Sequence, residues 1–590
     1  MLTRREFIYL MAMLGSAPVF ANSHVRYSFS SKSHPENYYK LQPFGNARIL
    51  HMTDTHAQLV PVYFREPSVN IGIGEDWGKP PHLVGHHFLK YYGIKNRRLA
   101  YAYTCVDFLE NAKSFGKLGG FAHIKTVADF LRKDFGPDKT LFLDGGDTWQ
   151  GSWTALQTRG KDMVDALNIL GVDAMTGHWE FTYTEKEVLD NIKRFKGDFV
   201  AQNVFVKDEA LFNGAPVYDE DTGRAFPPYT IKERGGVRIA VIGQAFPYTT
   251  IANPQRFIPD WTFGIKPDEM QELVNEIKKK HKADVIVVLS HNGADVDKKM
   301  ARVVEGIDFI LGGHTHDAVP APIPVKNKSG VTYVINSGSN GKFLSVLDLE
   351  VKDGKVKDFK YTLLPIFSDL VPADKEMAAF IEGVRLPYQK ELNEVLATTD
   401  EVLYRRGNFN GSWDQVICDA LREVNGAQIS LSPGFRWGTT VIPEGGKITF
   451  DDLATQTAMT YPETYVKEID GKTLKAILED VADNLFNKDP FYQQGGDMVR
   501  TGGMTYTIDP TKDAGKRISD MRLSDGTPID PHKKYKVSGW ATVGSKSPGR
   551  PVWEVTAEYL RAKKHLKHIK LETPRIVGVD GNPGIDTNCS

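Results

Sequence analysis

Short apolar runs alternate with amphipathic stretches between residues 45 and 370. The apolar runs have the length of buried strands and lie at 47–52, 140–143, 173–176, 237–243, 284–289 and 307–311. Segments with a helical period of apolar positions lie between several of them, at 120–135, 162–170, 185–195 and 267–282. Alternating strands and helices predict a layered α/β domain, in which ligands bind on loops at the carboxyl ends of the strands.

The alternation is interrupted at 58–117 and ends near residue 370. The segment 58–117 is rich in Pro, Gly, His and Tyr. A loop of this length in a compact domain is usually functional or disordered, and its aromatic residues favour an ordered flap over a site. The charged segment 371–399 reads as one connector helix, running from Ala373 to Val395.

A second, smaller domain is expected at 400–575. Its pattern predicts helices near 412–424 and 471–485, a turn at 432–438 and glycine-rich loops at 495–503.

The N-terminus has the features of an export signal. Arg4 and Arg5 precede Phe7, and an apolar stretch of signal-peptide length ends at Ala21. The paired arginines indicate a twin-arginine signal over 1–21, and an uncleaved membrane anchor is the alternative. We therefore expect a periplasmic protein beginning near Asn22, with no membrane association after signal removal.

The net charge and the cysteine count argue against a nucleic-acid partner and against a disulfide framework. The chain has 73 Lys and Arg against 74 Asp and Glu, a net charge of −1, which argues against a nucleic-acid partner. Three cysteines, Cys105, Cys418 and Cys589, are too few for a disulfide framework. We expect three unpaired thiols in preference to one disulfide.

Seven Asp and His side chains, which are common metal ligands, occur in five short clusters, most of them directly after an apolar run. They are Asp54, His56, Asp147, His178, His291, His314 and His316. Strand ends of one sheet system meet at one rim, so the seven are expected to lie close together. Mixed imidazole and carboxylate ligands suit Mn, Fe or Zn, and the sequence does not choose among them.

The order Asp-x-His, Gly-Asp, Gly-His, His and Gly-His-x-His resembles the calcineurin-like metallophosphoesterase core, and the whole chain resembles the 5'-nucleotidase family. The resemblance implies a four-layer α/β/β/α sandwich followed by a smaller C-terminal α/β domain. It also implies two metal ions bridged by Asp147. Asp54, His56, Asp147 and His316 would hold one ion, and Asp147, His178, His291 and His314 the other.

Two departures from the nucleotidase pattern affect the predicted chemistry. The third cluster reads Gly177-His178-Trp179-Glu180-Phe181-Thr182, so the His–Asp dyad that helps an alkoxide leave in nucleotidases is missing. The stretch 498–503 has no aromatic ring where nucleotidases stack the base. Arg436 matches the family arginine that holds the anionic end of the substrate. Glu180 is expected to support a ligand histidine.

These departures resemble the thiosulfohydrolase (SoxB) branch of the 5'-nucleotidase superfamily, as do the segments 63–67 and 119–123. The branch implies two Mn²⁺ ions and release of sulfate from a cysteine S-thiosulfonate, which a sulfur-carrier protein presents on a peptide arm. By this resemblance the catalytic residues are Asp147, His178 and Arg436. Arg436, Trp179 and Asn408 would contact the substrate. A persulfide leaves more readily than an alkoxide, because its basicity is no higher than that of a thiolate of pKa about 8.5.

Two alternatives remain from the sequence. One is a periplasmic 5'-nucleotidase or related phosphoesterase, and the other is a non-catalytic, metal-containing subunit that binds the carrier. The missing dyad argues against the first, and the complete ligand set argues against the second. Four further histidines are interpreted as surface or packing residues, namely His82, His86, His87 and His123.

Overall fold

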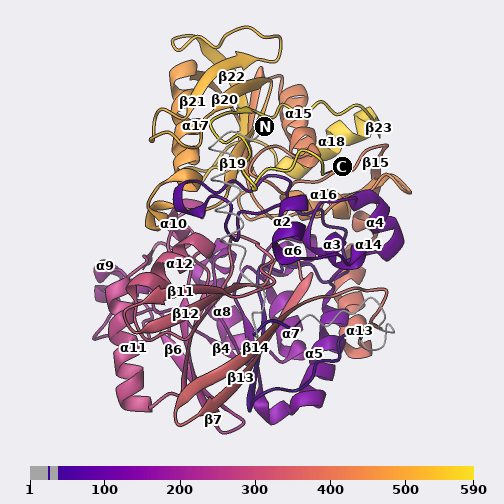
Figure 1. Cartoon of the computed structure of the whole chain (residues 1–590). Helices are drawn as coiled ribbons and strands as arrows, with labels where there is room; N and C mark the ends of the chain where they lie inside the picture. The colour runs from indigo at the N-terminus through magenta and orange to yellow at the C-terminus, as the bar shows by residue number, and fades with distance from the viewer. Residues whose placement is uncertain (1–23, 27–37, 590) are drawn as a thin grey trace, which may run out of the picture.

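The computed structural model describes residues 24–26 and 38–589, so the expected signal at 1–21 lies outside the described residues. Within the part of the chain that is described, no helix combines the length and apolar character needed to cross a bilayer. Figure 1 shows two stacked domains, with the second domain, in orange and yellow, above the first.

The first domain is built on two six-stranded mixed sheets. The first sheet has the order β14(Lys355–Pro365), β13(Phe343–Lys352), β1(Ala47–Met52), β2(Thr140–Asp144), β3(Ala174–Met175), β4(Asp198–Phe199). The second has the order β11(Ile323–Asn327), β12(Gly330–Asn336), β10(Phe309–Gly312), β9(Val285–Ser290), β7(Val237–Gln244), β6(Tyr229–Arg234). Neighbours β1 to β4 are parallel, as are β7, β9, β10 and β12.

Alternating side chains of the second sheet belong to two different cores. In β7, Ile239 and Val241 pack in the core shared with the first sheet. Their neighbours Ala240 and Ile242 pack on the other face with residues of α11(Pro267–His281) and α12(Ala294–Val303). Because side chains alternate across a strand, this sheet is buried on both faces.

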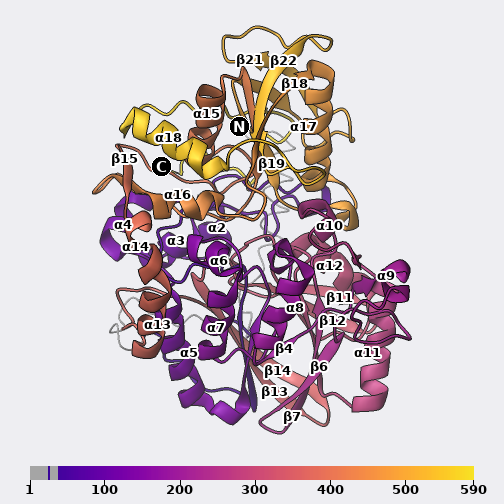
Figure 2. The ribbon, with the colours of Figure 1, turned by 180° about the vertical axis from the view of Figure 1, so that it is seen from behind.

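Helices on the outside of both sheets complete four layers. The first sheet carries α5(Phe121–Phe135) and α7(Lys161–Leu170), and α8(Glu185–Arg194) packs beside α7. Figures 1 and 2 show α5 and α7 on one side of the strands and α11 on the other. The expected α/β/β/α arrangement is confirmed, and the six predicted strands and four predicted helices agree with the observed elements to within about two residues at each end.

The connector is not a single helix. It consists of α13(Lys375–Arg385), a 3-10 turn at Leu386–Tyr388 and α14(Gln389–Leu392), and 395–399 forms strand β15(Val395–Thr399). Pro387 interrupts the helical pattern, because proline lacks a backbone N–H and clashes with the preceding turn. Residues after Glu394 instead pair with β17(Lys447–Thr449) in the second domain.

The second domain holds three small sheets and four helices in the part of the chain that is described. Its central sheet has the order β18(Thr464–Asp470), β22(Lys534–Trp540), β16(Ile429–Gly434), β19(Asp497–Gly502). The smaller sheets contain β17, β15, β23(His565–Leu566) and β21(Ile518–Leu523), β20(Met504–Ile508), β24(Arg575–Ile576). The helices are α15(Ser412–Asn425), α16(Phe450–Thr457), α17(Gly471–Phe486) and α18(Val552–Lys563).

The second domain contains the helices that its sequence predicted, but one predicted loop is a strand. The helices expected at 412–424 and 471–485 are confirmed as α15 and α17. The expectation of loops throughout 495–503 is wrong, because 497–502 pairs with β16 as strand β19. The glycines at 495 and 496, which precede the strand, both have positive φ.

The segment 58–117 is ordered and lies at the junction of the domains. It contains α2(Gly85–Tyr92), α3(Arg97–Tyr103) and α4(Phe108–Phe115), which Figure 1 shows in indigo beneath the second domain. Val69 forms a β-bridge with Ile585, and Asn408 donates its backbone N–H to the Val69 carbonyl at 3.0 Å.

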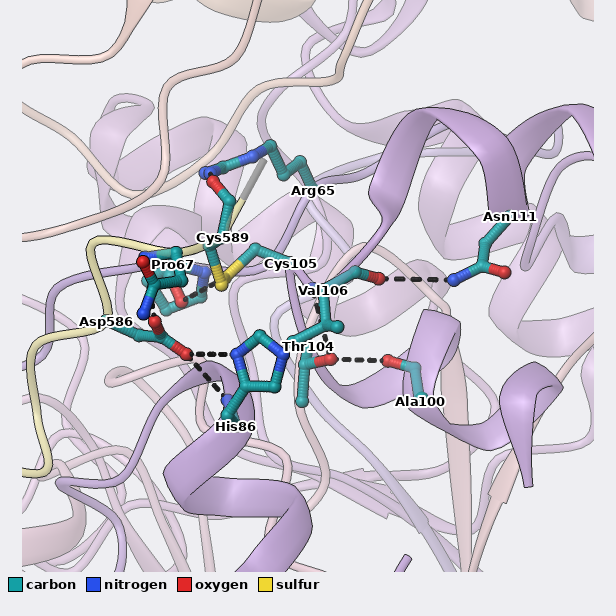
Figure 3. Close-up of a disulfide and its surroundings, with 11 residues drawn as sticks. Arg65, Pro67, His86, Ala100, Thr104, Cys105, Val106, Asn111, Asp586 and Cys589 are labelled. Atoms are coloured by element: carbon teal, nitrogen blue, oxygen red, sulfur yellow. Dashed lines mark hydrogen bonds and ion pairs between the residues drawn. A yellow bond between two sulfur atoms is a disulfide. The ribbon is translucent and has the colours of Figure 1, made fainter. Parts of the chain in front are cut away.

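A disulfide joins Cys105 in this segment to Cys589 near the end of the chain (Figure 3). The expectation of three unpaired thiols is therefore wrong, and Cys418 alone is a free, buried thiol. The pairing could not be read from the sequence, because 484 residues separate the two cysteines and only the fold brings them together. Beside the disulfide, Asp586 accepts hydrogen bonds from the backbone N–H of His86 at 2.7 Å and lies 2.8 Å from its ring.

Candidate metal centre

The seven candidate ligands follow the carboxyl ends of five strands and converge where the two sheets meet. Asp54 and His56 follow β1, Asp147 follows β2, and His178 follows β3 in the first sheet. His291 follows β9, while His314 and His316 follow β10 in the second sheet. All seven side chains are buried, the most exposed being His314 at 8%.

The loops that carry the ligands are held in unusual backbone conformations. Five of the seven have positive φ values, namely Asp54 (53°), His56 (44°), Asp147 (58°), His314 (71°) and His316 (60°). This region costs a non-glycine residue roughly 1–3 kcal/mol, so the surroundings must enforce it. Hydrogen bonds between loops do so: Asp54 N–H donates to Gly146 O at 2.9 Å, and His56 N–H to Asp147 O at 2.8 Å.

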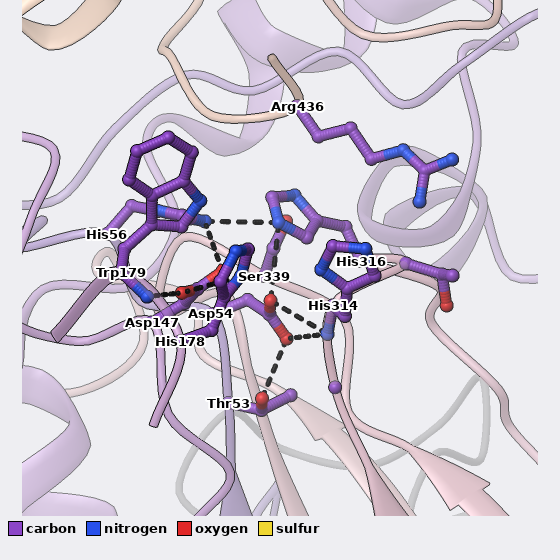
Figure 4. A network of polar contacts seen from close by, with 12 residues as sticks. Thr53, Asp54, His56, Asp147, His178, Trp179, His314, His316, Ser339 and Arg436 are labelled. Atoms are coloured by element: carbon purple, nitrogen blue, oxygen red, sulfur yellow. Dashed lines mark hydrogen bonds and ion pairs between the residues drawn. The ribbon is translucent and has the colours of Figure 1, made fainter. Parts of the chain in front are cut away.

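The side chains form two groups of four that share Asp147 (Figure 4). Asp54, His56, Asp147 and His316 make one group, and Asp147, His178, His291 and His314 the other, with the donor atoms of each group within 4.8 Å of one another. One Asp147 oxygen lies 3.0 Å from His291 Nε2 and 3.6 Å from His56 Nε2, and the other lies 3.4 Å from His178 Nδ1. This grouping is the one that the resemblance implied.

Apart from the identity of the side chains, the hydrogen-bonding state of their ring nitrogens also fits a pair of bound cations. His291 Nε2 and His178 Nδ1 are buried without a hydrogen-bond partner among the described residues, and they lie 3.0 and 3.4 Å from the oxygens of Asp147. The Nε2 atoms of His56 and His316 lie 3.1 Å from each other beside the same centre. Buried polar atoms are normally satisfied, so a cluster of orphan acceptors needs an explanation. Coordination to divalent metal ions would satisfy them.

The protonation states also suit metal binding. Burial lowers the pKa of His56, His178, His314 and His316, which keeps these rings neutral. For His291, burial acts to lower the pKa, but Asp147 and Asp54 outweigh it and raise the pKa to about 10. A cation would replace the proton that these two carboxylates attract.

Glu180 supports the centre through the backbone, not through a ligand ring. Its buried carboxylate accepts N–H bonds from Thr148 at 2.7 Å and from His178 at 2.8 Å, and from Asp147 and Trp149 at 3.1 and 3.2 Å. Glu180 thus contacts a ligand histidine, as expected, but through the backbone N–H of His178 and not through its ring. Glu180 also ties the Asp147 loop to the His178 loop.

A cavity of about 190 Å³ opens beside the ligands, between the two domains. His56, Asp147, His178 and His314 form part of its wall, and Trp179, Phe246, Tyr248, Phe435 and Trp437 form an aromatic part. Phe435 and Trp437 stack on each other with centroids 4.0 Å apart, and Trp179 meets both edge-on. The rings therefore cover one another's faces.

Arg436 enters this cavity from the second domain, as expected, and Figure 4 shows it above His314 and His316. Its Nη2 donates to Gly496 O at 2.7 Å, and its Nε lies 3.4 Å from Asp497 Oδ1. Its Nη1 is buried and has no partner in the described part of the chain. The guanidinium is thus anchored along one edge and keeps a donor for an anion.

The sequence interpretation missed a second arginine, Arg406. Its Nη2 donates to the carbonyl of Thr315, between His314 and His316, at 2.8 Å. Its Nε and Nη1 are buried without hydrogen-bond partners among the described residues. The Arg405–Arg406 pair just before Asn408 was the available signal, but only the domain packing shows that Arg406 binds the loop of His314 and His316 while Arg405 binds Asp414.

Asn408 does not line the cavity of about 190 Å³ beside the ligands. It is 3% exposed, its Oδ1 accepts the Ile71 backbone N–H at 2.7 Å, and its Nδ2 lies 3.3 Å from Asp497 Oδ1. Asn408 borders a smaller cavity on the other side of His314, together with Arg436, and the substrate contact stays a prediction.

The segment 58–117 does not roof the larger cavity. It borders the smaller cavity on the other side of His314, through residues such as Asn70 and His82. The four other histidines are absent from both ligand groups. His82 pairs with Asp295, His86 with Asp586, and His123 contacts the Val371 carbonyl, in agreement with a packing or surface role.

Comparisons with known proteins agree with this geometry. Residues 47–318 match the calcineurin-like phosphoesterase family, and residues 395–552 match the 5'-nucleotidase C-terminal domain. A solved structure of a sulfate thiohydrolase SoxB from Thermus thermophilus, in complex with glycerol, is similar with a TM-score of 0.83. It is 34% identical and covers 92% of this chain and 98% of that one.

Curated relatives are more distant. The 5'-nucleotidase of Mus musculus is 25% identical over 467 residues, which are 71% of this chain and 76% of that protein. The trifunctional nucleotide phosphoesterase protein YfkN of Bacillus subtilis is 26% identical over 459 residues. The match spans 70% of this chain but 30% of that longer protein.

Proposed function

Because this chain belongs to the 5'-nucleotidase family of calcineurin-like metallophosphoesterases, we propose that its metal-dependent hydrolase centre acts as a thiosulfohydrolase. The substrate is a cysteine S-thiosulfonate on a sulfur-carrier protein, and the products are sulfate and a persulfide on the carrier. The bond that breaks joins the sulfonate sulfur to the neighbouring sulfur, and water supplies the oxygen.

The observation that carries the proposal is the lack of a free acid beside the centre among the described residues. The side chains around the larger cavity include one carboxylate, Asp147, which belongs to both ligand groups, and no lysine. Trp179 occupies the position of the dyad histidine, and Thr182 lies with its Oγ1 2.7 Å from that of Thr460 in the second domain. An alkoxide would need a proton donor here, whereas a persulfide of thiolate-like basicity leaves as an anion.

The cavity also suits a thin substrate. Its volume of about 190 Å³ is below the roughly 300–1,000 Å³ typical of sites for drug-sized ligands. Phe435 and Trp437 stack on each other, so each ring has one face already covered and unavailable to a nucleobase. An extended peptide arm ending in a thiosulfonate requires less width than a nucleoside.

Each group of residues around the cavity has its own role in the proposed reaction. Two divalent cations, for which Mn²⁺ is our proposal and Zn or Fe the alternatives, would activate water and neutralise charge on the sulfonate when bound. Asp147 and His178 hold and orient the centre from the first domain. Arg436 binds sulfonate oxygens with its free Nη1, since planar guanidinium donors match a tetrahedral oxyanion. Trp179 and Phe246 exclude water from the side of the leaving sulfur.

A partner and a compartment follow from this proposal. The carrier would present its arm at the cavity mouth, where Ile251 is 53% exposed. The Arg4–Arg5 pair supports export to the periplasm by the twin-arginine route. Replacing both arginines by lysine should leave folded protein in the cytoplasm, and an unchanged periplasmic yield would point to the general secretory route.

The deciding experiment compares two substrates on one metal-analysed preparation. Sulfate release from an S-thiosulfonated carrier and phosphate release from AMP are measured side by side, with Asp147→Asn as the inactive control. We expect kcat/KM to favour the carrier by about a hundredfold or more. Comparable turnover of AMP would support the 5'-nucleotidase activity of the curated relatives. Absence of turnover of either substrate with both metals bound would support a non-catalytic carrier-binding subunit.

A further inference from the structure

Asp497 lies behind the cavity and contacts Arg436, which lines the cavity, and Arg406, which binds the loop of His314 and His316. It is the first residue of β19, and its side chain is fully buried. It follows Gly495 and Gly496, which carry the chain past the centre. The sequence motifs assign it no role.

The carboxylate of Asp497 contacts both arginines. Its Oδ1 lies 3.4 Å from Arg436 Nε, and its Oδ2 lies 3.8 Å from Arg406 Nη1. The adjacent carbonyl of Gly496 accepts from Arg436 Nη2 at 2.7 Å. Arg436 is therefore held on its Nε and Nη2 edge, which leaves Nη1 as its unpartnered donor among the described residues.

The surrounding network contains more positive than negative groups. Four buried or nearly buried arginines, at 405, 406, 436 and 500, face the carboxylates of Asp414, Asp497 and Asp317. Arg405 and Arg500 each contact Asp414, at 2.9 and 3.3 Å. Arg500 also contacts Asp497, at 3.2 Å, and Arg406 lies between Asp317 and Asp497, at 3.9 and 3.8 Å. Among the described residues, Asp497 is the one carboxylate paired with Arg436, so the Nη1 of Arg436, which lines the cavity, is available to a bound anion.

Asp497 remains a carboxylate in this setting. Burial acts to raise its pKa, but Arg436, Arg500 and Arg406 outweigh burial and lower it. An ionised partner holds a guanidinium in a more definite orientation than a neutral one, because charge-assisted hydrogen bonds are shorter and stronger.

We propose that Asp497 is the positioning residue that orients Arg436 toward the oxyanion of the substrate, while it also contacts Arg406, which is bound to the loop of His314 and His316. This inference rests on the proposed function for the identity of the anion, a sulfonate. The orientation itself is independent of whether the anion is a sulfonate or a phosphate. Asp497 does not touch the substrate and acts through Arg436.

Simple electrostatics makes the opposite prediction, so the two explanations can be separated. Removing a negative charge beside an anion site should tighten anion binding by Coulomb's law alone. Removing the group that orients Arg436 should weaken binding. Asp414 provides the matched control, because it is equally buried and contacts Arg405 and Arg500, but not Arg436.

The test measures binding of inorganic sulfate by calorimetry to the full, Mn-loaded protein. We expect Asp497→Asn to raise the Kd of sulfate about tenfold with two ions still bound, and Asp414→Asn to change it less than about twofold. In an Arg436→Ala background, Asp497→Asn should add less than about a twofold further change, because its partner is already gone. On the carrier, KM should rise more than kcat falls.

Three results would overturn the proposal: tighter sulfate binding in Asp497→Asn, equal effects of the Asp497 and Asp414 variants, or full additivity with Arg436→Ala. If Asp497→Asn does not fold, Asp497→Glu keeps the charge but moves it, and wild-type sulfate affinity in that variant would also contradict us. Because sulfate binding needs no turnover, failure here is distinguishable from failure of the thiosulfohydrolase assignment.

Discussion

Gly495 of the second domain lies directly against the ring of His314 of the first. A Cβ atom at this glycine would stand 2.0 Å from His314 Nε2 and 2.8 Å from Cδ2, closer than any real contact allows. The φ angle of Gly495 is +75°, in the region that favours glycine. The second domain therefore touches a candidate metal ligand with bare backbone.

Gly495→Ala should consequently displace either the loop or the His314 ring. We expect weaker binding of the ion held by His178, His291 and His314, by about tenfold or more, and a higher KM for substrate. Manganese titration and steady-state kinetics measure the two effects. Gly515 has a φ of +80° with nothing within 4 Å, so Gly515→Ala carries the same backbone cost without the contact. If both variants bind metal equally well, the contact has no functional role.

Asp147→Asn should remove more metal than any other single ligand change, because Asp147 belongs to both groups of four. Elemental analysis should give about two ions per chain for the unmodified protein and fewer than about one for the variant. Asp54→Asn is the comparison, since Asp54 belongs to one group. Two tightly held ions in Asp147→Asn would contradict a bridging role.

Glu180→Gln should weaken metal binding although Glu180 is not a candidate ligand. The amide would place N–H donors against the four backbone N–H groups that the carboxylate now accepts, and the Asp147 and His178 loops would separate. We expect a loss of about 10–100-fold in metal affinity. Glu187→Gln, which disturbs the cap of α8 and the pair with Arg159, should lower stability but leave metal affinity unchanged.

His51 should make the first domain sensitive to acid. Burial lowers its pKa from 6.5 to about 3. The unfolded chain binds a proton at higher pH than the folded one, so this stability is fully present above about pH 6.5. It is lost at up to about 1.4 kcal/mol per pH unit as the pH falls toward 3. His51→Gln should flatten this part of the unfolding profile, measured with chelator present, whereas replacing the exposed His87 should not.

The Cys105–Cys589 disulfide should stabilise the junction of the two domains. It joins residues that are 484 positions apart and ties the C-terminal segment to 58–117. Cys105→Ser should cost about 2–5 kcal/mol of unfolding free energy, seen as a lower Tm, and reduction of the native protein should lower Tm similarly. Cys418→Ser, which removes the free cysteine, is the control. This variant keeps the disulfide, so reduction should lower its Tm as it does for the unmodified protein.

Local pattern was sufficient for the strands, for most helices and for the identity of the seven clustered side chains. Each candidate ligand follows a strand within a few residues, and strand ends of a parallel arrangement meet at one edge, so adjacency in the sequence predicts adjacency in space. The apolar runs also predicted buried strands, and β7 and β9 are buried on both faces.

Contacts between distant segments were decided by packing. Pro387 divides the connector, Cys105 meets Cys589 across 484 residues, and Gly495, Arg406 and Asp497 reach the centre only because the second domain sits on the first. None of these residues has a neighbour in the sequence that indicates its partner. Hydrophobic period reports which face of an element is buried, but the partner of that face depends on the summed free energy of the whole chain.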